Sequence, residues 1–143
     1  MKENINALDE INKGATMGMD AITYVQDKVE DPNFKEVLNK QYKDYETISE
    51  KIKNIYKKYN SEDKPHETNS MNKMMTWSGI NMKTMNDHST SKLAELLLQG
   101  TNMGIIEGRR IYNKKEIDSE VSDIVKEYVD MQERCVEKLK EFL

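Results

Sequence analysis

The sequence has few of the residues that carry covalent or metal chemistry in proteins. Among its 143 residues are two histidines, one cysteine, two prolines and six glycines. The single cysteine, Cys135, excludes an internal disulfide. Proline and glycine are too scarce to supply many turns, and β-branched residues seldom alternate with polar ones, so a β-sheet is not expected.

Long hydrophobic runs and a strongly basic charge are also missing. The longest purely aliphatic run, Leu96-Leu97-Leu98, is far shorter than a membrane-spanning helix. Acidic residues outnumber basic ones by 26 to 22, and the net charge of -4 argues against general binding to nucleic acid or to an anionic membrane. Polar residues follow Met1 at once, so no signal peptide is expected. We predict a cytoplasmic protein with no nucleic-acid or membrane partner.

What the sequence does contain is amphipathic helices, and the clearest begins at Asp31-Pro32. An aspartate can cap the free N–H groups of a first turn, and a proline there loses no hydrogen bond. After it, residues suited to a packed face recur at alternating intervals of four and three: Phe34, Leu38, Gln41, Tyr45, Ile48, Ile52, Ile55 and Tyr59. Such a helix is not stable alone, so this stripe must pack against other helices.

The same periodicity predicts three further long helices and one short helix. The long ones are expected over residues 4–29, from Ser89 to Tyr112, and from about Glu116 onward; the short one, from Ser70 to about Met85, follows a polar loop over residues 60–69. The third long helix is predicted to bury Leu93, Leu97, Gly100, Gly104, Glu107 and Ile111, with Leu96 and Met103 widening the stripe. The last helix carries Ile117, Val121, Ile124, Tyr128, Met131, Cys135, Leu139 and Phe142.

These elements predict a single all-α domain over residues 1–143. Four long helices would form a bundle, with a long crossover between the second and the third. That crossover contains the short helix. Because tight turns flank a single long crossover, we expect the ferritin-like arrangement of a four-helix bundle.

The segment over residues 74–112 resembles a bacterial branch of the ferritin-like superfamily that consists largely of domains of unknown function. The resemblance rests on Met74-Met75-Thr76-Trp77, Met82 to Met85, Asp87-His88 and the run from Leu93 to Gly100. It implies a tryptophan in the short crossover helix and a helix reading Leu-x-x-x-Leu-x-x-Gly-Glu. This chain has Gly100-Thr101 instead, so the carboxylate that the family pattern places there is missing.

A di-iron carboxylate site is not expected. Such a site needs a Glu-x-x-His pair on each of two helices, and no glutamate here is followed three residues later by histidine. His66 follows Asp63 by three residues but lies in the predicted loop, and His88 lies at a predicted helix start. No phosphate-binding glycine loop, nucleophile elbow, zinc-ligand spacing or nucleic-acid motif is present. The sequence therefore predicts no catalytic residue, no metal-binding residue and no cofactor.

Methionine is abundant and supports two interpretations. Nine methionines follow the first residue: Met17, Met19, Met71, Met74, Met75, Met82, Met85, Met103 and Met131. Thioethers can bind Cu(I), and the group from Met71 to Met85, with His88 nearby, is the most suggestive. Alternatively, methionine fills irregular gaps in a helical core or forms an adaptable contact surface.

Other candidate residues also have structural interpretations. Cys135 is predicted to be a buried, inert thiol. Glu107 is placed on the inner stripe, where it would pair with a base or a tyrosine or point past Gly108 to solvent, with an acid or ligand role as the alternative. Arg109-Arg110 with Lys114-Lys115 could hold a phosphate or satisfy carbonyls at a helix end. Trp77 would cover an end of the bundle or meet a partner. Hydrogen-bonded polar groups within the helix-packing face are expected from several tyrosines and two glutamines: Tyr42, Tyr45, Tyr56, Tyr59, Tyr112 and Tyr128, with Gln41 and Gln132.

The leading hypothesis is a non-enzymatic, metal-free structural or protein-interaction bundle whose partner is a second copy or another protein. The alternative is a module that binds Cu(I) or a small apolar ligand through core and crossover methionines. A third hypothesis is an iron-dependent oxidase with an atypical site.

Overall fold

The computed structural model describes residues 2–114 and 116–143, which form five α-helices and no β-strand. The helices are α1 (Lys2–Gln26), α2 (Pro32–Tyr56), α3 (Ser70–Thr84), α4 (Thr90–Asn113) and α5 (Ser119–Lys140). The predicted all-α class is confirmed for these residues. Each helix begins within one turn of its predicted start, and α1, α3 and α4 end within one turn of their predicted ends.

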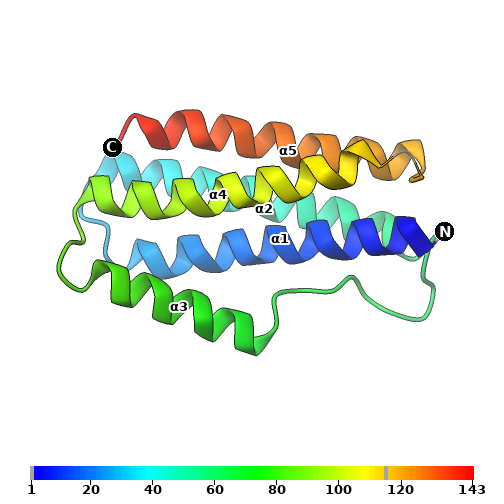
Figure 1. Cartoon of the computed structure of the whole chain (residues 1–143), viewed down its shortest axis with the longest axis horizontal. Helices are drawn as coiled ribbons and strands as arrows, with labels where there is room; N and C mark the ends of the chain where they lie inside the picture. The colour runs from blue at the N-terminus through cyan, green and yellow to red at the C-terminus, as the bar shows by residue number, and fades with distance from the viewer. Residues whose placement is uncertain (1, 115) are drawn as a thin grey trace.

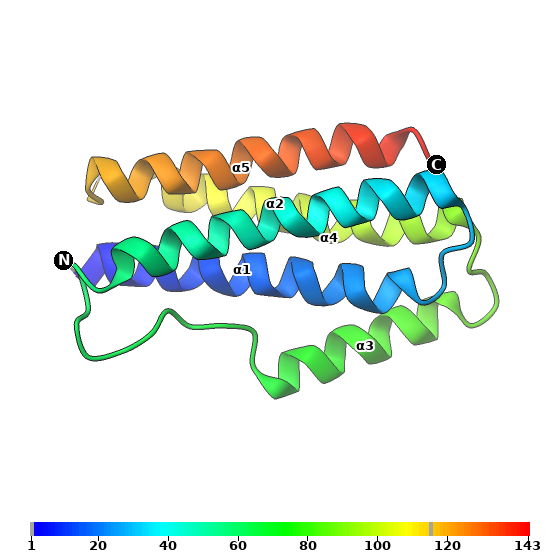
Figure 2. The ribbon, with the colours of Figure 1, turned by 180° about the vertical axis from the view of Figure 1, so that it is seen from behind.

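Four long helices lie side by side, and α3 lies outside them against α1 (Figures 1 and 2). A short turn joins α1 to α2, which run antiparallel, and α4 and α5 form a second antiparallel pair (Figure 1). Helices α2 and α4 run in the same direction. The segment between them, which holds the loop and α3, therefore returns the chain to the end where α2 began.

Side-chain caps fix where several helices begin. The Asp31 carboxylate accepts hydrogen bonds from the backbone N–H groups of Asn33 and Phe34, at 2.8 and 3.2 Å. Asn69 caps α3 and Ser89 caps α4 in the same way. The start of α5 is held differently, because the Asp118 backbone N–H donates to Asn4 Oδ1 of α1 at 2.8 Å.

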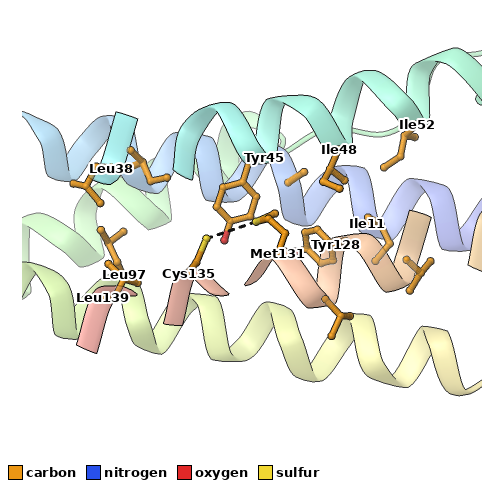
Figure 3. Close-up of a cluster of buried hydrophobic side chains, with 14 of the residues drawn as sticks. Ile11, Leu38, Tyr45, Ile48, Ile52, Leu97, Tyr128, Met131, Cys135 and Leu139 are labelled. Atoms are coloured by element: carbon orange, nitrogen blue, oxygen red, sulfur yellow. Dashed lines mark hydrogen bonds between the residues drawn. The ribbon is translucent and has the colours of Figure 1, made fainter. Parts of the chain in front are cut away.

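The core lies along the line where the long helices face one another. The α2 stripe is buried from Phe34 to Ile52 as predicted, and Tyr56 then replaces the half-buried Ile55 on the inner face. Figure 3 shows side chains of α2 meeting those of α5 in this seam. Burial at this level stabilises the fold by about 1.5–3 kcal/mol for each large aliphatic side chain.

The inner face of α4 differs from the prediction. Gly100 and Glu107 are exposed, and Thr101 and Gly108 take the inner positions instead. The backbone of α4 approaches α5 closely here, since a Cβ added to Gly108 would lie 2.7 Å from Val129 Cγ2. Met103, expected to widen the stripe, points to solvent and is 72% exposed.

Candidate functional site

A buried carboxylate on α1 anchors the loop that precedes α3. Asp9 is 6% exposed, and its Oδ1 accepts hydrogen bonds from the Tyr56 hydroxyl at 2.8 Å and from the His66 backbone N–H at 3.0 Å. The His66 ring lies beside it, with Nδ1 at 3.6 Å from Asp9 Oδ2. Next along α1, the Asn12 amide donates to the His66 carbonyl at 2.8 Å and accepts from the Ser49 hydroxyl at 2.7 Å.

The anchoring continues one turn further along α1. The hydroxyls of Thr16 and Thr68 lie 2.8 Å apart, and the Thr68 backbone N–H donates to Thr16 Oγ1 at 2.9 Å. We call Asp9, Asn12, Thr16, His66 and Thr68 the loop latch. Asp9, Asn12, Thr16 and Thr68 are buried and hydrogen-bonded, whereas the His66 ring is exposed and its backbone makes the contacts, so the geometry is that of a structural network. The sequence analysis did not predict the loop latch. The pattern that could have indicated it is the row of polar residues Asp9, Asn12 and Thr16, which lies beside the apolar stripe of α1.

A second buried polar group lies in the middle of the bundle. Gln132 Nε2 donates to the Tyr45 hydroxyl at 3.2 Å, and Gln41 Nε2 donates to the Cys135 carbonyl at 3.5 Å. Removal from water raises the pKa of Tyr45 to about 12 and that of Tyr128 as well. Both phenols therefore stay protonated near neutral pH. Of the predicted tyrosines, Tyr42, Tyr59 and Tyr112 are only partly buried.

Cys135 lies on the inner face of α5, as expected. Its thiol donates to Met131 Sδ at 3.6 Å (Figure 3). Burial raises the pKa of the thiol to about 12, so the nucleophilic thiolate is scarce at neutral pH. The sulfur atoms of Cys135 and Met131 thus serve packing.

The remaining charged candidates lie on the surface. Glu107 is exposed, so its predicted inward position is wrong and the solvent-facing alternative holds: Gly108 occupies the inner position. The Arg109 guanidinium lies 5.5 Å from the centre of the Tyr112 ring, and Lys115 of the basic cluster lies outside the described residues. Among residues 2–114 and 116–143, no three His, Cys, Asp or Glu side chains are placed to hold a metal ion.

A surface hollow lies between the end of α2 and the latched loop. It has a volume of about 330 Å³ and brings together Lys53, Lys57, Lys64, Asp63 and Glu67. Charges of both signs line it, and Lys53 Nζ lies 3.8 Å from a Glu67 carboxylate oxygen. With three lysines against two carboxylates, the hollow carries little net charge and is not selective for an anion.

Most of the large apolar side chains that are exposed in the described chain lie on α3 or at its C-cap. Met71, Met74, Met75, Met82 and Met85 are 72, 69, 66, 72 and 73% exposed, and we call these five residues the methionine stripe. Only Ile80 and Thr84 of α3 are buried, against the bundle. The core-filling interpretation is thus wrong for these five methionines. Trp77 is 53% exposed, so at least half of its side chain is not packed against the bundle as a cover for one end would be.

The methionine stripe is narrow and straight. At about 100° per residue, its five side chains and Ser78 fall within a sector of about 100° around the helix axis, and Ile80 points the opposite way. Met71, Met75, Ser78, Met82 and Met85 follow intervals of four, three, four and three. This spacing is that of a helix that packs along one further helix.

No described helix has the length and apolar character needed to span a bilayer. Comparison with models of known families, with curated proteins and with solved structures gives no match.

Proposed function

We propose that this chain is a non-enzymatic structural or protein-interaction module with a ferritin-like topology, and that the methionine stripe of α3 is its contact surface. The observation that carries the proposal is the outward position of five methionines, each about two-thirds exposed or more. Exposed apolar patches on soluble domains mark interaction sites, and flexible thioether side chains adapt to a partner.

Two further features support the proposal. The parallel course of α2 and α4, with a long connection between them, supports a ferritin-like topology, because such bundles have one long crossover. The buried phenols and the buried thiol remain protonated at neutral pH, which suits packing better than acid–base or nucleophilic chemistry. A cytoplasmic location remains part of this proposal.

Site-specific photocrosslinking in producing cells tests the function. A benzophenone side chain placed at Met82 should crosslink to a polypeptide, whereas the same group at Met103 should not. Met103 is the matched control because it has the same 72% exposure but lies on α4. Equal crosslinking at the two positions, or none at Met82, would reject an interaction role for α3.

Binding of Cu(I) is the second candidate, and one observation favours it. Met71, Met74 and Met75 lie within about one turn of α3 and are open to solvent, so their thioethers are accessible to a soft metal. Titration with Cu(I) under reducing conditions should show one tightly held ion. Binding should disappear when the three methionines are changed to leucine, which keeps the apolar surface. Absence of binding to the unchanged protein would reject this candidate, and stoichiometric iron in protein purified without chelator would instead support an atypical oxidase.

A further inference from the structure

We propose that the partner of the methionine stripe is a second copy of this chain, packed antiparallel against it about a two-fold axis at Ser78. This inference rests on the proposed interaction role of α3 and names its partner. In a symmetric dimer each copy presents the same surface, so that surface must be complementary to itself when turned by 180°.

The spacing of the stripe meets this requirement. Met74 and Met82 lie four residues before and after Ser78, and Met71 and Met85 lie seven residues before and after it. A two-fold axis at Ser78 therefore places Met71 and Met74 of one copy near Met85 and Met82 of the other. The small serine at the centre lets the two helices approach closely.

The charge distribution of α3 allows self-pairing. Lys73 and Lys83 are its only charged residues. Both lie more than about 120° from the centre of the stripe around the helix axis, so neither faces the partner helix. The stripe is flanked by the neutral residues Asn72, Gly79 and Asn81. No like charges are brought together across the axis, whereas partner-specific helix pairs usually carry charges at these flanking positions.

The surroundings of the stripe leave room for a second helix. A Cβ added to Gly79, beside the central serine, would meet no atom within 4 Å. The helix of 15 residues is about 22 Å long, so the paired surface is small and the dimer should dissociate readily on dilution. A membrane is disfavoured as the occupant, because the stripe is narrow and the chain carries a net charge of -4.

Disulfide trapping tests the position of the axis. In the variant Ser78→Cys the two new thiols would lie next to each other across the axis, and mild oxidation should link most of the protein into covalent dimers. The variant Met103→Cys is the control and should remain largely monomeric, and the buried Cys135 should give no background. Equal rates of crosslinking in the two variants would overturn the proposed axis.

Sedimentation of the purified full chain tests the dimer itself. The unchanged protein should show a concentration-dependent shift from monomer to dimer, and Met82→Asp should raise the dissociation constant by more than about tenfold because a charge would be buried in the apolar seam. Met103→Asp should leave it unchanged, and circular dichroism should show both variants folded. A protein that stays monomeric at high concentration would overturn this inference. If Met82 still crosslinked in cells to a different polypeptide, or the stripe bound only vesicles of anionic lipid, the second copy would be rejected; the crosslink alone would leave the interaction role standing.

Discussion

The buried face of α2, which we call the α2 seam, and the methionine stripe of α3 have the same residue spacing but opposite surroundings. Both follow steps of three and four residues, yet Leu38, Ile48 and Ile52 of α2 are buried, and the methionines of α3 are about two-thirds exposed or more. The α2 seam uses branched and aromatic side chains of defined shape, whereas the stripe uses unbranched thioethers. Hydrophobic periodicity therefore identifies the helix face that packs against another element. The residue types on that face then distinguish a permanent core from an adaptable contact surface.

Truncating one residue in each region should give the largest contrast. Ile52→Ala removes a fully buried side chain and should lower the free energy of unfolding by about 2–5 kcal/mol. Met75→Ala should lower it by less than about 0.5 kcal/mol, because that side chain is already in water. Urea denaturation at low protein concentration measures both values. Similar losses in the two variants would mean that the stripe packs within its own chain.

Removing the acceptor at the centre of the loop latch tests how the two regions are joined. Asp9→Ala leaves the Tyr56 hydroxyl and the His66 backbone N–H without their acceptor, which should destabilise the fold by about 1–3 kcal/mol. Hydrogen exchange should accelerate over residues 60–84 and stay slow in α5.

The neighbouring Glu10→Ala is the control for Asp9→Ala, since Glu10 is exposed and pairs with Lys13 at the surface. It should change stability by less than about 0.5 kcal/mol. Uniform acceleration of exchange through α5 in Asp9→Ala would show that the two regions unfold as one unit.

Two glycines offer a smaller contrast of opposite sign. Gly108→Ala should lower stability by about 1 kcal/mol, because the collision with Val129 outweighs the gain in helix propensity. Gly79→Ala should raise the stability of α3 by about 0.5–1 kcal/mol, because its added methyl group meets no neighbour. Thermal unfolding and hydrogen exchange measure the two effects. A stabilising Gly108→Ala would contradict the close contact between α4 and α5.

The sulfur atoms of the methionine stripe should be more reactive at neutral pH than those of α5, which face α2 in the core. Mild peroxide should oxidise the five methionines of the stripe well before Met131, which is 2% exposed. Mass spectrometry of peptides measures the order of oxidation. Cys135 should resist alkylation until the chain unfolds, because its thiol pKa lies near 12.

The same burial predicts the direction of the alkaline response. Burial raises the pKa of Cys135 from 9.0 to about 12 and that of Tyr45 from 10.0 to about 12, so the unfolded chain loses these protons first. Stability is unaffected below about pH 9 and should fall progressively between pH 9 and pH 12. Chemical denaturation at a series of pH values tests this; constant stability up to pH 12 would contradict the buried state of these groups.

The sequence predicts the helices well because caps and periodicity are local properties. Asp31, with Pro32, fixes the start of α2, and the alternation after it identifies the buried face. The prediction for the inner face of α4 is wrong around Glu107 because Gly100, Gly104 and Gly108 have no side chains. They therefore do not indicate the rotational phase of the helix, that is, which side faces the bundle. Contacts with Gln132 and Val129 of α5, which lie far along the chain, decide that phase.

The candidate site was predictable only in part. The sequence predicts the short helix and shows its methionines, but the exposure of these side chains depends on how the long helices pack against α3. The loop latch links residues more than 50 positions apart, as in the bond from Asn12 to His66, so no local pattern announces it. A polar residue beside an apolar stripe gives the same sequence pattern whether its side chain faces water or bonds to a distant loop.

The loop latch has a consequence for how tightly the methionine stripe can be held by another molecule. The segment before α3 is tied to α1 at Asp9, Asn12 and Thr16, and α3 itself packs against α1, with Ile80 buried. Its backbone is thus already ordered before any encounter. Association then sacrifices mainly the rotational freedom of the methionine side chains, which reduces the entropic penalty and lets a short helix serve as a docking element.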